Sequence, residues 1–344
     1  MKKKIIVIIL LLLIISGMTG GYYFYNETVN QGHHSSKQVI VEVEQGETPK
    51  NLLNIMYKKG LVKNIMMGSL YLRLTNPKIK ANTYAFNTSM SLKDMFKEMG
   101  NDKSSYIMNS KLIIQEGLTI PAIAKKVAKL LNMDEKTILK TWNDQNYLKT
   151  LAKDYWFLDM KTLSNKNLLY PLEGYLYPDT YFINDKKPTL DLVTRKLLDM
   201  TNKKITPYKN KMTGMSVHQY LTLASIVEKE SLYDEDISKI AGVFMNRLNQ
   251  GMRLESDITV NYALQRTGVK VTHKMLQTKS PYNTYLYKGL PVGPVSSVEI
   301  KTLDRTIHYA KHDNYYFFAK KDGQVIYSKT YKQHLEAVEK YKWY

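Results

Sequence analysis

The chain has no cysteine among its 344 residues. This absence excludes disulfides, thiol catalysis, thiolate metal sites and a lipid-modified cysteine, and we expect neither a metal nor another cofactor. Negative charge is also scarce, because 31 acidic residues face 50 basic ones and the formal net charge is +19. Such a surplus predicts attraction to polyanions, although the lysines are scattered and a solvated lysine-rich surface is the simpler interpretation.

The N-terminus carries a long apolar run. Lys2 to Lys4 precede an uncharged stretch, Ile5–Tyr25, that is continuously aliphatic from Ile5 to Ile15. Because a helix needs roughly 20 residues to cross a bilayer, this stretch predicts a transmembrane anchor. A cleaved signal peptide is the alternative, but no Ala-x-Ala-like site follows and the aromatic residues from Tyr22 onward suit a membrane interface. The lysines then predict a cytoplasmic N-terminus and an extracytoplasmic remainder. Because nucleic acid is a cytoplasmic polyanion, we expect no nucleic-acid partner for that remainder.

Repeated strand–turn–helix segments follow a polar linker. A strand at 39–44 precedes Thr48 as N-cap, Pro49 as the first helical residue and a helix that stops at Gly60. Similar units pair a strand at 83–86 with a helix that 89–92 opens and that runs to 99–100, and a strand at 111–114 with a helix at 122–131. Such units predict an α+β fold. They resemble small LysM-like glycan-binding modules, and simple folding units are an equal alternative.

An aromatic segment at 169–182 interrupts the regular pattern. It is too rich in proline, glycine and tyrosine for a helix, and it includes Tyr177 and Asp179. Tyrosines among turn residues suit a sugar-binding surface, because a pyranose has an apolar face and hydroxyls that a tyrosine can satisfy. A turn held by buried aromatic side chains is an equal alternative.

Further elements are predicted toward the C-terminus. Helices are expected at 133–153, 188–200, 217–229 and 238–250, the last closed by Gly251. Strands at 315–319 and 324–327 flank an Asp322-Gly323 turn and predict a β-hairpin, after which Thr330 caps a helix through Lys340. A mixed α/β domain is therefore expected.

The helix at 217–229 leads into two acidic residues. Glu228 and Glu230 follow an apolar run that begins at Leu221. Poor solvation disfavours the charged form of a carboxyl group, so this position can produce a proton donor near neutral pH. Helical residues two apart project about 160° from each other, so these glutamates cannot form a facing acid–base pair. One is expected to act and the other to support it.

Polar residues downstream complete the candidate site. Asn246 and Arg247 offer donors for sugar hydroxyls or peptide carboxylates. Glu255 or Asp257 offers a second carboxylate, which glycosidic cleavage normally needs unless the substrate supplies the nucleophile. Ordinary capping and ion pairing is the alternative for residues of these types.

An ordered series of motifs carries a family resemblance. The motifs are Ala224-Ser-Ile-Val-Glu-Lys-Glu230, Val243-Phe-Met-Asn246-Arg247-Leu248, Gly251-Met-x-Leu254-x-Ser256-Asp257, Thr259-Val260, Ser280-Pro-Tyr282-Asn283-Thr284-Tyr285, Gly289-Leu-Pro291 and Gly293-Pro294. Together with the segment from Glu173 to Tyr181, they resemble the MltG-type (YceG-like) endolytic murein transglycosylases over nearly the whole chain.

The resemblance implies a reaction and roles for the residues. Glu230 is the implied catalytic acid, with Glu228 as a positioning residue. The implied reaction cleaves the β-1,4 bond between MurNAc and GlcNAc in nascent glycan strands, forms 1,6-anhydro-MurNAc ends and limits strand length. Implied partners are peptidoglycan, the membrane and cell-wall synthesis proteins. Substrate contacts are implied for Asn246, Arg247, Glu255, Ser256, Asp257, Tyr282, Asn283, Tyr285, Tyr177 and Asp179.

The implied organisation is a cytoplasmic tail at 1–4, a transmembrane anchor at 5–25, a linker at 26–38, a LysM-like module at 39–104 and a YceG-like catalytic region at 105–344. Several positions depart from the family pattern: Glu255 replaces Gln, Ile258 replaces Pro, Ser297-Val298-Glu299 replaces Asn-Pro-Gly, and His308-Tyr309 lies near another usual Asn-Pro. Glu255 adds negative charge near the proposed acid. A noncatalytic glycan-binding scaffold and a hydrolase that uses water and Asp257 are the remaining alternatives.

Overall fold

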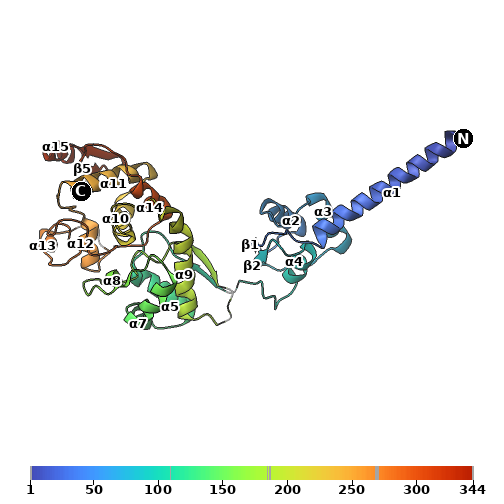
Figure 1. Ribbon diagram of the computed structural model, residues 1–344, viewed down its shortest axis with the longest axis horizontal. Coiled ribbons are helices and arrows are strands. Elements are labelled where there is room, and N and C mark those ends of the chain that lie inside the picture. The colour runs from blue at the N-terminus through green and yellow to red at the C-terminus, as the bar shows by residue number, and fades with distance from the viewer. Residues whose placement is uncertain (1, 109, 184, 186, 268–270, 343–344) are drawn as a thin grey trace. The chain divides into compact units, whose positions relative to one another are not determined.

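The computed structural model describes residues 2–108, 110–183, 185, 187–267 and 271–342. The chain folds as two compact units, unit 1 (Met1–Lys111 with Phe182–Lys186) and unit 2 (Leu112–Tyr181 with Lys187–Tyr344). Both units contain helices and strands, which Figure 1 labels. The mixture of helix and strand agrees with the expected fold.

Unit 1 builds its core between a two-stranded sheet and its helices. Its elements are α1 (Lys2–Val29), β1 (Gln38–Val43), α2 (Pro49–Lys58), α3 (Ile65–Thr75), β2 (Asn82–Asn87) and α4 (Leu92–Met99). Strands β1 and β2 are antiparallel, with Val41 opposite Tyr84. Both side chains are buried in one apolar cluster with Leu52 and Met95 from α2 and α4. The strands and helices predicted here are confirmed to within a few residues.

Helix α3 is not predicted by the sequence pattern. Asn64 begins it by accepting a hydrogen bond from the Met66 N–H at 2.9 Å, and Gly68 lies in its first turns. A Cβ at Gly68 would lie 2.8 Å from Leu53 Cδ1. Glycine normally weakens a helix interior, but here it permits the close packing of α3 on α2.

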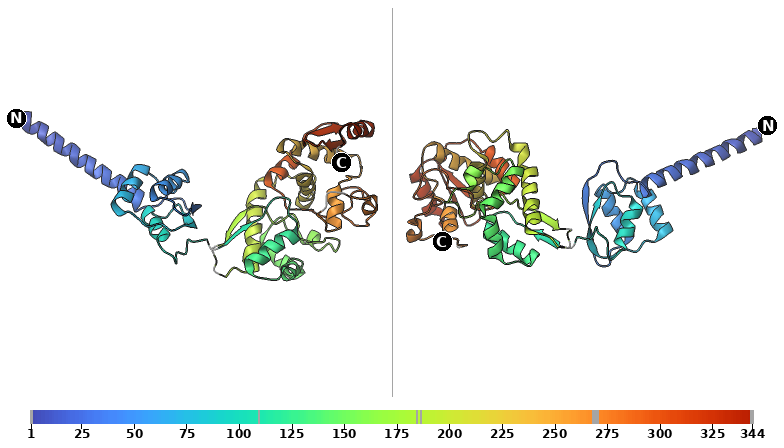
Figure 2. Two further views of the ribbon diagram at one scale, coloured as in Figure 1. Left: turned by 180° about the vertical axis from the view of Figure 1, so that it is seen from behind. Right: turned by 60° about the horizontal axis from the view of Figure 1, so that its bottom comes forward.

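The expectation of a transmembrane anchor at 5–25 is wrong. In the described part of the chain, no helix is both long and apolar enough to cross a membrane. The aliphatic run inside α1 ends at Ile15. At about 1.5 Å per residue it extends roughly 16 Å, about half of a hydrocarbon core of about 30 Å. The last turn of α1 is part of unit 1, because Thr28 and Val29 are buried and α1 contacts α3 and α4 (Figure 2).

Unit 2 is mostly helical. Its elements are α5 (Ile120–Leu131), α6 (Glu135–Trp142), α7 (Gln145–Asp154), α8 (Met160–Leu163), α9 (Leu190–Ile205), η1 (Thr206–Tyr208), α10 (Val217–Glu230), α11 (Asp234–Asn249), α12 (Asp257–Ala263), α13 (His273–Leu276), α14 (Ile300–Ile307), β5 (Tyr316–Ala319), β6 (Val325–Ser328) and α15 (Tyr331–Tyr341). Strands β3 (Ser110–Ile113) and β4 (Thr180–Ile183) pair with each other, as do β5 and β6.

The single helix predicted at 133–153 is two helices, α6 and α7. Asn143 ends α6, and the next residue, Asp144, accepts a hydrogen bond from the Tyr147 N–H at 2.8 Å. Aspartate is a strong N-cap residue, so the chain begins a new helix at this point.

Helix α10 lies at the centre of unit 2. It contacts α11, α12 and α14, and every side chain from Tyr220 to Val227 is buried. A capping box begins it: Ser216 Oγ accepts from the Gln219 N–H at 3.2 Å, and Gln219 Oε1 accepts from the Ser216 N–H at 2.8 Å. A helix buried on all sides is held rigidly, which fixes the position of Glu230 at its end.

The predicted C-terminal hairpin is confirmed. Strands β5 and β6 are antiparallel, with Tyr316 opposite Ser328. Gly323 in the turn has φ +86°, and a Cβ there would lie 2.5 Å from the ring of Tyr233. Glycine is therefore required both for the backbone conformation and for the contact. Thr330 caps α15 in a capping box, as expected.

The aromatic segment at 169–182 forms turns up to Asp179 and then enters β4, and buried side chains hold it in place. Tyr175, Tyr177 and Tyr181 are all buried, and the Tyr181 hydroxyl donates to the Tyr177 carbonyl at 2.6 Å. Their rings pack in the interior, so the packing interpretation describes this segment.

Glu173, in the same turn, is a fully buried carboxyl group. Its exposed fraction is 1%, and its two oxygens accept from the Ile120 N–H at 3.0 and 3.2 Å. The Tyr262 hydroxyl donates to Oε2 at 3.0 Å. Burial raises the pKa of Glu173 to about 8 despite these donors. The side chain is thus mostly protonated at neutral pH while it joins α5 to α12.

We predict that Glu173→Gln alters how stability depends on pH. The folded pKa lies above the unfolded value of 4.5, so the contribution of the protonated group is complete below about pH 4.5 and is lost as pH rises toward 8. Between about pH 5 and 8, the unfolding free energy of the wild type should fall relative to that of E173Q, by on the order of 3 kcal/mol. Denaturant unfolding across this range measures the difference, and a pH-independent difference would contradict a buried, protonated Glu173.

Candidate active site

Glu230 ends α10 at the edge of the buried core. Its side chain is half-buried, and Oε1 accepts a hydrogen bond from Ser256 Oγ at 2.6 Å. Burial raises the pKa of Glu230 to about 6; the Ser256 donor lowers the pKa, the charge of Asp257 raises it and that of Arg247 lowers it. A carboxyl group that titrates near 6 can both donate and accept a proton close to neutral pH.

Ser256 is held in place by a network of hydroxyl groups. It is 2% exposed; its N–H donates to Thr284 Oγ1 at 3.1 Å, and its carbonyl accepts from Thr259 Oγ1 at 2.7 Å. The two threonine hydroxyls are 2.9 Å apart. The preceding residue, Glu255, has φ +52°, a conformation that side-chain-bearing residues rarely adopt. The surrounding contacts therefore maintain a strained turn that directs Ser256 to Glu230.

Asp257 is the second carboxylate near Glu230. The Tyr285 hydroxyl donates to Asp257 Oδ1 at 2.7 Å. Burial raises the pKa of Tyr285, so the phenol keeps its proton and remains the donor. Four of the predicted residues are thus brought together, namely Glu230, Ser256, Asp257 and Tyr285.

Arg247 and Asn246 support the loops around this group. Arg247 is 7% exposed; its Nη1 donates to the Leu254 carbonyl at 2.7 Å and lies 3.5 Å from Glu255 Oε2. Asn246 Nδ2 donates to the His312 carbonyl at 2.6 Å. In this structure Arg247 Nε and Nη1 and Asn246 Nδ2 donate to main-chain carbonyls of the protein itself.

Glu228 points to a different segment from Glu230. Its Oε2 accepts from the Glu299 N–H at 3.2 Å, and the Tyr177 hydroxyl accepts from the Ile300 N–H at 3.2 Å. Both side chains therefore satisfy free N–H groups at the start of α14. Burial raises the pKa of Glu228. As the helical geometry requires, the two glutamates do not face each other.

The other predicted residues lie in packed turns. Tyr282 and Asn283 are each 1% exposed, and Asn283 Nδ2 donates to the Leu276 carbonyl at 2.9 Å. Asp179 Oδ1 accepts from the Thr180 N–H at 2.7 Å. These contacts hold main-chain segments, and substrate contacts for these residues remain predictions.

The model of the YceG-like family matches residues 41–340. The chain belongs to the YceG-like family. This membership confirms the resemblance that the ordered motifs indicated.

Individual relatives agree with the family match. The YceG-like chain is 31% identical over 310 residues to the endolytic murein transglycosylase of Bacillus subtilis strain 168, covering 89% of this chain and 86% of that protein. It is 33% identical over 319 residues to the endolytic murein transglycosylase of Streptococcus pneumoniae serotype 2 strain D39, covering 88% of this chain but only 58% of that protein. A crystal structure of a YceG-like protein from Listeria monocytogenes superposes with a TM-score of 0.64 at 33% identity, covering 88% of this chain and 100% of that one.

At two positions that depart from the YceG-like pattern, Ser297 and Glu255, the structure shows what the side chain contacts. Ser297 Oγ accepts from the Leu118 N–H at 3.1 Å and donates to the Gln115 carbonyl at 3.2 Å, so it ties two loops together. Glu255 pairs with Arg247. Its charge is partly balanced there, and the carboxylate that raises the pKa of Glu230 is Asp257 instead.

Thr259 and Thr284 shape the site of this YceG-like chain without having been predicted as site residues. Both are buried, and both bond to Ser256. Their only signal in the sequence is membership of the motif series, because small hydroxyl residues so far apart form no distinctive spacing.

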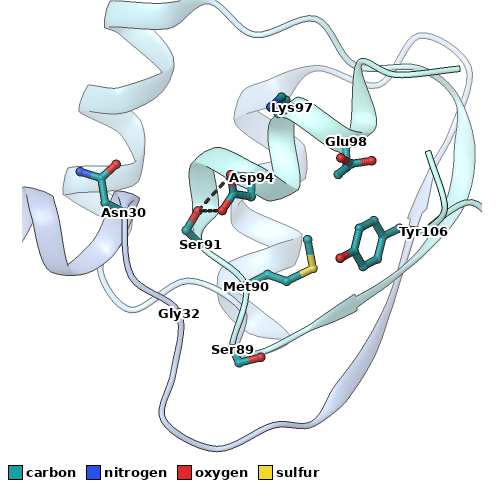
Figure 3. A pocket seen from close by; sticks show the side chains of 9 residues that line it. All are labelled: Asn30, Gly32, Ser89, Met90, Ser91, Asp94, Lys97, Glu98 and Tyr106. Carbon is teal, nitrogen blue, oxygen red and sulfur yellow. Dashed lines mark hydrogen bonds between the residues drawn. The ribbon is translucent and has the colours of Figure 1, made fainter. Parts of the chain in front are cut away.

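A separate cavity of about 420 Å³ lies in unit 1 of the YceG-like chain (Figure 3). Its lining residues are Asn30, Gly32, Ser89, Met90, Ser91, Asp94, Lys97, Glu98 and Tyr106. Ser91 Oγ donates to Asp94 Oδ2 at 2.6 Å and accepts from the Asp94 N–H at 3.1 Å. This polar pair caps α4, so its hydrogen bonds are accounted for by the fold.

We predict that Ser256→Ala raises the pKa of Glu230, because the lost donor favoured the charged carboxylate. NMR titration of the Glu230 carboxyl carbon measures the change. Ser238→Ala, on α11, is a matched control whose side chain is outside the Glu230 contacts. A pKa that stays the same or falls in S256A would contradict this role of Ser256.

Proposed function

We propose that this protein is a murein transglycosylase that cuts glycan strands internally. The reaction cleaves the β-1,4 bond between MurNAc and GlcNAc and leaves a 1,6-anhydro-MurNAc end. The observation that carries the proposal is half-buried Glu230, which has a pKa of about 6 and accepts a hydrogen bond from Ser256. The relatives named endolytic murein transglycosylase support the substrate class.

Glu230 acts first as an acid and then as a base. The protonated carboxyl group donates its proton to the glycosidic oxygen as the bond to C1 breaks. The resulting carboxylate accepts the proton of the muramoyl 6-hydroxyl, whose oxygen bonds to C1 and closes the anhydro ring. Ser256 stabilises the carboxylate between these steps through its 2.6 Å hydrogen bond.

An internal nucleophile removes the need for a second carboxylate that faces Glu230. Glycosidases normally place two carboxyl groups across the scissile bond, unless the substrate supplies the nucleophile. Asp257, the nearby candidate, has Oδ1 engaged by the Tyr285 hydroxyl at 2.7 Å. Its charge instead helps to keep Glu230 protonated until the sugar is bound.

The proposed substrate lies outside the cytoplasmic membrane, and we propose that the catalytic unit acts there on nascent strands. A formal charge of +19 suits a surface that works among anionic cell-wall polymers. Cleavage within a strand would limit its length.

We predict that kcat/KM falls as pH rises above about 6. Only the protonated form of Glu230 can donate to the leaving oxygen, so well above its pKa the active fraction drops about tenfold per pH unit. Initial rates of anhydro-end release from purified peptidoglycan, measured in a series of buffers, give the profile. A rate that stays level up to pH about 8 would contradict the assignment of Glu230 as the acid.

We predict that Glu230→Gln lowers the rate by about 10² to 10⁴-fold, because glutamine keeps the shape but carries no transferable proton. Mass analysis of the products measures this, since anhydromuramoyl ends are lighter by one water than hydrolysis products. Glu235→Gln, an exposed glutamate on α11, makes the same chemical change as a control and should retain activity.

The same product analysis distinguishes the two alternatives, a hydrolase and a noncatalytic scaffold. Reducing muramoyl ends from the wild type would indicate a hydrolase that activates water, with Asp257 as the candidate base. Glycan binding without any cleavage, unchanged in E230Q, would indicate a scaffold.

A further inference from the structure

An open cavity of about 380 Å³ lies between the end of α11 and the start of α15. Its lining residues are Gln250, Met252, Tyr315, Tyr316, Lys329, Thr330 and Tyr331. Aromatic, amide, hydroxyl and ammonium groups thus converge on one hollow. Such a mixture of apolar faces and a few polar groups is typical of small-ligand sites.

Two tyrosine rings, Tyr316 and Tyr331, line the aromatic side of this cavity, and the His334 ring packs against both. The Tyr316 and His334 ring centroids are 5.4 Å apart at an interplanar angle of 23°, and those of Tyr316 and Tyr331 are 5.7 Å apart at a tilted angle of 49°. Burial lowers the pKa of His334, so its ring is neutral at pH 7 and packs as an apolar partner. Tyr331 is nevertheless 58% exposed. A large ring held in place by its neighbours offers a ready flat surface to a ligand.

A continuous chain of contacts joins this cavity to Glu230. The Arg247 guanidinium lies 5.0 Å from the Tyr316 ring centroid, and its Nη1 lies 3.5 Å from Glu255 Oε2. The residue after Glu255 is Ser256, which donates to Glu230. The cavity therefore borders the same loop that positions the proposed acid.

We propose that this cavity is a glycan subsite, which holds a hexosamine of the strand away from the bond that Glu230 cleaves. This inference rests on the proposed function and extends it. The sugar's apolar face stacks on Tyr331, and its polar substituents meet Gln250 and Thr330. A subsite whose lining residues are separate from Glu230 and Ser256 makes cleavage depend on strand length, because a short strand cannot occupy both places.

Lys329 gives the subsite a preference for peptide-bearing sugars. Its ammonium group forms an ion pair with Asp313 at 2.8 Å, and both side chains are exposed. Exposed pairs contribute little to stability, so a stem-peptide carboxylate can replace Asp313 at small cost.

Binding and kinetics of Tyr331→Ala test the subsite. In an E230Q background, which keeps the glycan intact, calorimetric titration with purified uncrosslinked glycan strands should show about tenfold weaker binding when Tyr331 is also Ala, equivalent to about 1.4 kcal/mol. In the active protein, the ratio of kcat/KM for long over short strands should fall about tenfold, mainly through KM. Tyr331→Phe, which keeps the ring, should restore both values.

Tyr341→Ala is the matched control, because Tyr341 is an exposed tyrosine on the same helix outside the cavity lining. Equal binding and equal length preference in Y331A and Y341A would overturn the subsite. If the wild type binds glycan without cleaving it and the Y331A substitution still weakens binding, the subsite stands and the proposed reaction fails.

Lys329→Gln should reduce the preference for peptide-bearing over peptide-free strands. An equal loss of affinity for both kinds of strand would contradict the contact between Lys329 and a stem-peptide carboxylate.

Discussion

The hydrogen bond from Ser256 to Glu230 opposes the effect of burial, and the proposed chemistry depends on that balance. Burial alone favours the neutral acid, whereas the Ser256 donor and the charge of Arg247 favour the carboxylate, and the resulting pKa is about 6. Glu173 shows the other limit. It also accepts hydrogen bonds, but it is 1% exposed and its pKa is about 8. Such a group keeps its proton, whereas Glu230 can exchange one.

Helix α10 provides the rigid support for this balance. Its last turn carries two glutamates that hold separate segments: Glu228 bonds to the N–H of Glu299 before α14, and Glu230 bonds to Ser256 before α12. The negative end of the helix dipole also disfavours a carboxylate at its last residue, which acts in the same direction as burial. A site on a buried helix keeps the geometry that proton transfer requires.

Local patterns in the sequence predicted much of the fold, and long-range contacts explain what they missed. The ends of α10, the Asp322-Gly323 hairpin and the raised pKa of Glu230 follow from capping residues, turn chemistry and an apolar run. The sequence pattern does not predict α3, because a glycine at position 68 disfavours a helix locally and only the close packing against Leu53 accounts for it. The prediction of a membrane anchor is wrong because the continuously aliphatic run is too short to cross a bilayer. The bonds that fix Ser256 come from Thr284, in a different loop, and no local pattern reveals them.

The most direct test of the central claim is the origin of the oxygen at the new muramoyl end. Cleavage carried out in water enriched in heavy oxygen, followed by mass analysis, separates attack by the sugar's own hydroxyl from attack by solvent. A single shuttling glutamate predicts products that contain no heavy oxygen. Incorporation of one solvent oxygen per cut would contradict the account and would require a second group that activates water.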